Sequence, residues 1–168
     1  MKALYIASVW LHILAAMLWL GGMLYLVFVL VPVLRRQTYG GIAGRFLHEM
    51  GVQFRNLGWV CFGLLLASGT FNLAYRGYGW ADIWNGRLWQ GPFGRAFAIK
   101  MVLFTLILIA SALHDFWIGP KATAAMRQNP TDPATLRLRR QAGLFGRFNL
   151  LLGLLVVFMA VMMVRGWF

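Results

Sequence analysis

The chain contains four apolar stretches, each long enough to cross the hydrocarbon core of a bilayer. They cover residues 3–34, 57–75, 96–118 and 148–164. A crossing needs roughly 20 apolar residues, and backbone polar groups cannot stay unpaired at that depth, so each stretch is predicted to be a helix. The sequence therefore predicts an all-α integral membrane four-helix bundle, with residues 1–168 forming a single transmembrane domain.

Composition supports this interpretation and leaves no segment for a soluble domain. Hydrophobic residues make up 61% of the chain and charged residues only 12%. The first stretch is much longer than the 7 to 15 apolar residues of a secretory signal, so we expect it to remain as a helix. Cys61, the only cysteine, lies within the second stretch and is expected to pack rather than to form a disulfide or a cysteine cluster. The pattern supports no internal repeat.

The net charge of +12 points to membrane orientation rather than to nucleic acid, because the basic residues flank the apolar stretches. Ten of them surround the first and third connections: Arg35, Arg36, Arg45, Arg55, Lys121, Arg127, Arg137, Arg139, Arg140 and Arg147. Six lie toward the opposite side: Lys2, Arg76, Arg87, Arg95, Lys100 and Arg165. The excess of positive charge predicts that the first and third connections are cytoplasmic and that both termini are extracytoplasmic.

The connections differ in character. The second alternates aromatic residues with glycines and is predicted to lie at the level of the lipid headgroups: Tyr78, Trp80, Trp84, Trp89 and Phe93 with Gly77, Gly79, Gly86 and Gly91. In the third connection, residues 129–133 contain two prolines and predict a turn or helix break. The basic run Arg137, Arg139 and Arg140 follows, and we expect it to meet anionic lipid headgroups.

Ionisable residues at membrane depth are the leading candidates for function, because they are costly there and usually face the bundle interior. His12 lies nine residues into the first helix, about 13 Å below the outer surface. Lys100 lies on the third helix, which has an outer start near Gly94, and is about 9 Å deep on the same outer side. We therefore predict that His12 and Lys100 meet on the outer side.

A second group is predicted on the cytoplasmic side. His114 and Asp115 end the third helix there, while His48 and Arg55 lead into the second. At about 100° per residue, Lys100 and His114 fall within about 40° of each other on one helix face. The same spacing places His48 and Arg55 on one stripe with Phe62 and Gly69, provided that the second helix extends back to His48.

Each candidate also has a purely structural interpretation. Lys100 could extend its long stem to the membrane surface, and His12 could be a core histidine that hydrogen-bonds a neighbouring helix. His48 could be an ordinary loop residue, and His114 with Asp115 could cap a helix end.

Four segments of the chain resemble the CopD family of bacterial membrane proteins, in order and over nearly the whole length. They are "LHILAAMLWLGGMLYLVFVLVPVLRR", "FRNLGWVCFGLLLASGTFNL", "GRAFAIKMVLFTLILIASALHDFWIGPKA" and "GRFNLLLGLLVVFMAVMMVRGW". The resemblance implies a multi-pass protein of the bacterial inner membrane and a role in copper uptake or resistance.

A more distant similarity connects the chain to HemJ, the family of membrane protoporphyrinogen oxidases. It rests on the histidine before Trp-Leu-Gly-Gly and on the lysine followed by an apolar span that ends in histidine. In that family a histidine of the first helix and a lysine of the third are associated with activity and bound haem b, which implies such roles for His12 and Lys100. The chain departs from HemJ around Arg35 and "HEMGVQFR", which weakens the implication of protoporphyrinogen oxidation.

Haem b is the predicted cofactor, because histidines that face a helical bundle are common axial ligands. His48 and His114 could ligate one haem, whose propionates would pair with Arg55 or Arg45, and His12 could ligate a second. This arrangement predicts membrane electron transfer or a haem-dependent oxidoreductase, with a quinone, a redox protein or a second copy of the chain as candidate partners.

Two other functions remain open. Copper is the alternative cofactor, with His12, Met159 and Met163 as contacts, although methionines at this spacing also serve packing. The protein could also be a noncatalytic subunit of a membrane complex that binds its partner through the aromatic connection and Trp167.

Overall fold

The computed structural model describes residues 1–34, 36, 40–129 and 131–165, and these contain helices and no β-strand. Four helices are long and apolar enough to cross a membrane, which confirms the predicted all-α membrane class. The chain divides into two compact units, Met1–Leu88 and Trp89–Phe168, each built around one helical hairpin. That the whole chain forms a single transmembrane domain stays a prediction.

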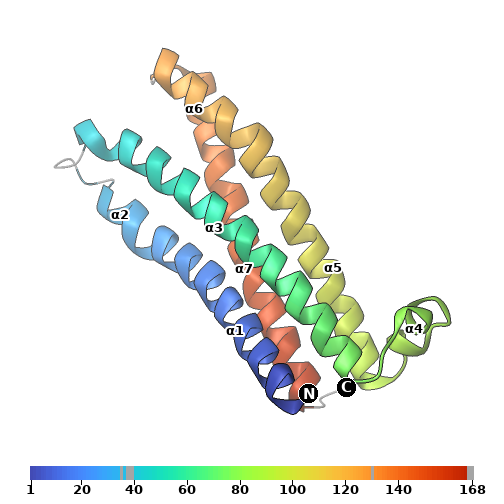
Figure 1. Ribbon diagram of the computed structural model, residues 1–168. Helices are drawn as coiled ribbons and strands as arrows, with labels where there is room; N and C mark the ends of the chain where they lie inside the picture. Colours follow the sequence, from blue (N-terminus) through green and yellow to red (C-terminus); the bar gives the residue numbers. More distant parts are fainter. Residues whose placement is uncertain (35, 37–39, 130, 166–168) are drawn as a thin grey trace. The chain divides into compact units, whose positions relative to one another are not determined.

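The first hairpin pairs the first helix with a long return helix (Figure 1). The first helix comprises α1 (Lys2–Tyr25), the π-helical segment η1 (Leu26–Leu30) and α2 (Val31–Leu34), and it returns as α3 (Gly40–Tyr75). The second hairpin comprises α5 (Gly91–Leu113), the π-helical segment η4 (His114–Ile118) and α6 (Gly119–Gln128), and it returns as α7 (Pro133–Arg165). Between the hairpins lie α4 (Trp80–Trp84) and the 3₁₀ turn η3 (Arg87–Trp89).

Three of the four helices extend beyond the predicted apolar boundaries. The second begins at Gly40 rather than near Leu57, the third runs from Gly91 to Gln128, and the fourth begins at Pro133 rather than near Phe148. Apolarity marks only the part of a helix that lies in lipid, whereas the extensions carry polar and charged residues beyond that part. At 36 residues, α3 is about 54 Å long, well beyond the hydrocarbon thickness of roughly 30 Å.

The core of the first hairpin is a seam of apolar contacts between α1 and α3. Trp19 packs against Phe62 with ring centroids 5.1 Å apart, and a Cβ placed on Gly58 would lie 3.5 Å from the Trp19 ring. Gly22 faces Phe54 so closely that a Cβ there would overlap its ring. Cys61 is 1% exposed beside this seam, in agreement with a packing role.

In each hairpin, the first helix changes to π geometry just before a proline. In η1 the N–H of Val31 donates to the carbonyl of Leu26 in an i to i−5 pattern, immediately before Pro32. In η4 the N–H of Gly119 bonds to the carbonyl of His114 in the same i to i−5 pattern, immediately before Pro120. A proline ring clashes with the carbonyl four residues earlier, and the wider π turn relieves this clash without ending the helix.

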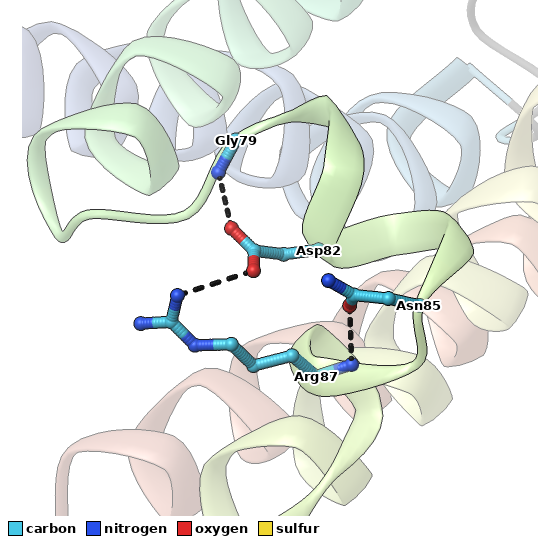
Figure 2. A network of polar contacts seen from close by, with 4 residues as sticks. All are labelled: Gly79, Asp82, Asn85 and Arg87. Carbon is cyan, nitrogen blue, oxygen red and sulfur yellow. Dashed lines mark hydrogen bonds and ion pairs between the residues drawn. The ribbon is translucent and has the colours of Figure 1, made fainter.

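The connection between the hairpins is an ordered turn rather than an extended strand of chain. The helix α3 ends at Tyr75, and Gly77, two residues later, has a φ of 84° in the left-handed region. Tyr78 N donates back to Leu73 O at 3.3 Å. Asp82 then accepts from Gly79 N at 2.8 Å and from Arg87 Nη1 at 3.2 Å (Figure 2). These bonds hold α4 and η3 together.

The same connection exposes two indole rings. Trp80 and Trp84 are one helical turn apart on α4 and are 77% and 85% exposed, whereas Leu88 is 1% exposed. That this connection lies at the headgroup level, where indole rings are commonly found, stays a prediction.

Candidate functional site

His12 contacts the return helix of its own hairpin within the membrane span. Its Nδ1 lies 2.8 Å from Ser68 Oγ, and its ring is half-buried. One turn earlier on α1, Ser8 Oγ donates to the backbone carbonyl of Ser68 at 3.4 Å. The interface therefore contains a short polar seam in which two positions of α1 meet Ser68 of α3.

The imidazole ring also lies next to Gly69. A Cβ placed on Gly69 would lie 3.4 Å from His12 Cε1, which is van der Waals contact. Ser68 itself is 5% exposed, and its hydroxyl lies 2.5 Å from the carbonyl of Leu64 on the same helix. The Nδ1 and Cε1 atoms of the ring therefore both lie against α3.

The second hairpin contains its own buried polar contact. Asn149 Nδ2 of α7 donates to Ser111 Oγ of α5 at 2.8 Å, and each residue is 6% exposed. The amide oxygen of Asn149 is buried without a hydrogen-bond partner in the described part of the chain, as is that of Asn72 on α3. Each of these oxygens could accept a bond from a water molecule or a bound ligand.

His114 and Asp115 form an adjacent pair at the start of η4. His114 Nδ1 lies 2.9 Å from Asp115 Oδ1, and the side chains are 35% and 15% exposed. The expectation that these residues end the third helix is wrong, because the helix continues through η4 and α6 to Gln128. They lie instead at a π-helical segment, a feature that is frequent at functional sites.

The structure places His48 and the two candidate arginines on the polar extension of α3. The helix does reach back beyond His48, as the predicted stripe with Arg55 requires, and His48 is exposed. Arg45 pairs with Glu49 at 2.9 Å, and Arg55 Nε donates to Asn56 Oδ1 at 3.4 Å.

Lys100 lies on the interior face of α5. Steps of seven and eleven residues bring Ile107 and Ser111 within about 20° of it on the helix, and these two side chains are 1% and 6% exposed. Because α5 begins at Gly91, Lys100 is about 13 Å from the helix start rather than 9 Å. Because α1 begins at Lys2, His12 is about 15 Å from the start of its own helix, a similar distance.

The predicted pairs each combine one residue from each hairpin. His12 and His48 belong to the first unit, and Lys100 and His114 to the second, so both pairings stay predictions. What the structure does bring together are partners within each hairpin, His12 with Ser68 and Ser111 with Asn149. Sequence reasoning missed Ser68, Asn72 and Asn149 because it considered only ionisable side chains, although uncharged polar residues inside apolar spans commonly bond across helices.

The described residues contain no group of three or more histidine, cysteine, aspartate or glutamate side chains that could hold a metal ion. Met159 and Met163 lie one turn apart on α7, and both are half-buried.

Comparison with known proteins identifies the family. The chain is 29% identical over 168 residues to an uncharacterized protein of Aquifex aeolicus (strain VF5), covering 99% of this chain and 98% of the relative. No solved structure gives a significant match. The family model described as copper resistance protein D matches residues 48–163, which include parts of both hairpins. The chain belongs to the copper resistance protein D (CopD) family.

Proposed function

We propose that this multi-pass inner-membrane CopD protein binds haem b through its membrane histidines and acts in electron transfer or haem-linked redox chemistry. The family and the four membrane-length helices support the membrane location. The haem, its ligands and the redox role are our proposal. A quinone or a redox protein would exchange the electrons.

The donor set fits haem better than a metal cage built from protein ligands. A porphyrin supplies four nitrogens to its iron, so the protein needs to add only one or two axial ligands. Single imidazoles on separate elements meet that need, whereas a closed protein site for a bare ion needs several donors together. The described residues include imidazoles on separate elements and contain no cluster of three or more histidine, cysteine, aspartate or glutamate side chains.

The contact of His12 with Ser68 is the observation that carries the proposal. A histidine that binds a metal usually has a hydrogen-bonding partner at its other ring nitrogen, and Ser68 Oγ occupies that position at 2.8 Å from Nδ1. His114 has the same kind of partner in Asp115. We propose His12 as the ligand of an outer haem, near Lys100, and His48 and His114 as ligands of a second, with Arg45 or Arg55 available to its propionates.

Bound haem would supply a one-electron redox centre, and the residues around it would set its environment. The half-buried His12 ring and the apolar walls of α1 and α3 would limit water at the iron. In this proposal the buried amide oxygen of Asn72 is available to accept a bond from a group at the site.

Copper transport or resistance is the second candidate, because the family description favours it. Cu(I) binds thioether and imidazole donors, which Met159, Met163 and His12 contain. A third outcome is a noncatalytic subunit, for which the exposed Trp80 and Trp84 would supply a contact surface. Trp167, the other proposed contact, lies outside the described residues.

Absorption spectra and metal analysis of the purified protein separate these functions. Haem predicts a Soret band with sharp reduced bands, and His114→Ala should lower the haem content or change the reduced spectrum. Stoichiometric copper without haem would support the copper candidate instead, and a stable partner without either cofactor would support the subunit. A folded His114→Ala variant with full haem content and an unchanged reduced spectrum would exclude His114 as a ligand.

A further inference from the structure

The hydroxyl of Ser68 has a single proton but two close polar neighbours. The carbonyl of Leu64 lies 2.5 Å from Oγ, and Nδ1 of His12 lies 2.8 Å from it. A carbonyl oxygen can only accept a hydrogen bond, so the Ser68 proton points toward Leu64. The Oγ atom must then accept, and the proton in the contact with His12 belongs to Nδ1.

The alternative arrangement would cost a hydrogen bond in a place where water cannot replace it. If Nδ1 lacked its proton, its lone pair would face the lone pairs of Ser68 Oγ. Ser68 could donate to Nδ1 only by giving up its bond to Leu64. Because Ser68 is 5% exposed within an apolar span, the arrangement that satisfies all three groups is strongly favoured.

From these contacts we infer that Ser68 is a positioning residue that keeps the neutral His12 ring in the Nδ1–H form and leaves the lone pair on Nε2. In this form Nε2 is the ring nitrogen that accepts, either a hydrogen bond or, under the proposed function, the haem iron. The part of this inference that concerns haem rests on the proposed function. The position of the proton does not, because the contacts involve only residues of this chain.

Gly69 lies against the same ring. A Cβ placed on it would lie 3.4 Å from His12 Cε1, the carbon between the two ring nitrogens, which is van der Waals contact. The ring therefore lies against α3, with Nδ1 directed at Ser68.

The position of the proton can be measured by ¹⁵N nuclear magnetic resonance of histidine-labelled protein in lipid nanodiscs. Replacing His48 and His114 by glutamine leaves His12 as the only imidazole, and the haem-free fraction is recorded at a pH at which the ring is neutral. With Ser68 present we expect one tautomer, with Nδ1 protonated. Ser68→Ala should give a mixture of both tautomers, and Ser68→Thr, which keeps the hydroxyl, should restore the single form.

Ser8→Ala is the matched control, because it removes a hydroxyl from the same interface while leaving Ser68 Oγ in place. It should keep the single Nδ1–H tautomer. Should Ser68→Ala fail to fold, as judged by helical circular dichroism and elution volume, Ser68→Cys replaces the hydroxyl by a weaker acceptor of similar shape and should also give a mixture. Protonation at Nε2 in the parent protein, or a single Nδ1–H form in the Ser68 variants, would overturn the inference.

Haem titration of the protein with all three histidines tests the consequence for binding. Loss of a partner that orients a ligating histidine typically weakens metal binding by about 10 to 100-fold, so Ser68→Ala should weaken haem binding at least tenfold and Ser68→Thr much less. If the parent protein takes up no haem, the proposed function fails while the resonance measurement still decides the role of Ser68. Equal haem affinity and midpoint potential in the parent and Ser68→Ala would show that Ser68 does not position a ligand.

Discussion

Individual polar residues inside the membrane spans are arranged toward the helix partner in the same hairpin. His12 meets Ser68, and Asn149 meets Ser111, although each side chain lies in an otherwise apolar helix. Lys100 follows the same rule in position, since it shares a face of α5 with the buried residues Ile107 and Ser111. A lysine that only extends its stem to the membrane surface does not need to lie on this interior face.

Lys100→Met should therefore reduce cofactor binding more than it affects folding. The substitution keeps much of the stem and deletes the charge, and His12→Ala should produce the same defect if the two residues form one outer site. We expect the affinity for the outer haem to fall at least about tenfold in both variants, as for loss of a ligand or its orienting partner, while the second haem is retained. Absorption spectra during haem titration measure cofactor binding, and helical circular dichroism measures folding.

Arg95→Met is the control for this comparison, because Arg95 is an exposed cation near the start of the same helix. It should leave haem content unchanged. Wild-type cofactor content in both Lys100→Met and His12→Ala would show that the proposed outer site does not exist.

At the scale of helices and turns, the sequence predicted the apolar spans well and their ends poorly. Side chains within the roughly 30 Å of hydrocarbon must be mostly apolar, so hydrophobicity alone is enough to predict the spans. The ends depend on local contacts that hydrophobicity does not report, such as the Arg45 to Glu49 pair on the extension of α3 and the Asp132 bond to Ala134 N at the start of α7. The Ser68 contact was missed for a similar reason, since a serine within an apolar span carries no signal of which helix it faces.

The turn around Asp82 should lose structure in acid. The backbone N–H of Gly79, followed by the charge of Arg87, holds the pKa of Asp82 below its ordinary value of 3.8, although partial burial opposes this. A lowered pKa means that the carboxylate stabilises the folded turn above pH 3.8 and that this contribution is lost as the pH falls through the lower folded value. Amide exchange at Gly79 and Arg87 should therefore become severalfold less protected below that pH.

Asp82→Asn should remove the pH dependence by removing the titrating group. Wild type and variant are compared at each pH, so the intrinsic dependence of exchange on pH cancels. Asp132→Asn changes an acid at a different turn and should leave protection at Gly79 as in wild type. Equal pH profiles in wild type and Asp82→Asn would contradict the role assigned to this carboxylate.

The whole molecule consists of two hairpins with a common design that the sequence did not reveal. Each first helix changes to π geometry before a proline, and His12 precedes Pro32 by the same twenty positions as Lys100 precedes Pro120. Under this correspondence the buried residues Trp19 and Met23 match Ile107 and Ser111. Few residues are identical between the hairpins, so the likeness emerges from helix geometry and burial and gives His12 and Lys100 corresponding positions.

This design places the basic residues at one end of both hairpins and predicts how the chain lies in the membrane. The extensions of α3, α6 and α7 carry most of the ten basic residues of the first and third connections, and Arg137, Arg139 and Arg140 are exposed on α7. Since positively charged segments are retained in the cytoplasm, these extensions should be cytoplasmic and both termini extracytoplasmic.

Reporter fusions test this orientation. Alkaline phosphatase needs disulfides that form outside the cytoplasm, so it should be active when fused after Phe168, a position beyond the described residues, and inactive when fused after Asn129. A cytoplasmic reporter should show the reverse pattern. Activity of the cytoplasmic reporter alone at Phe168, with both fusions inserted in the membrane, would reverse the orientation and place the proposed site of His12 and Lys100 on the cytoplasmic side.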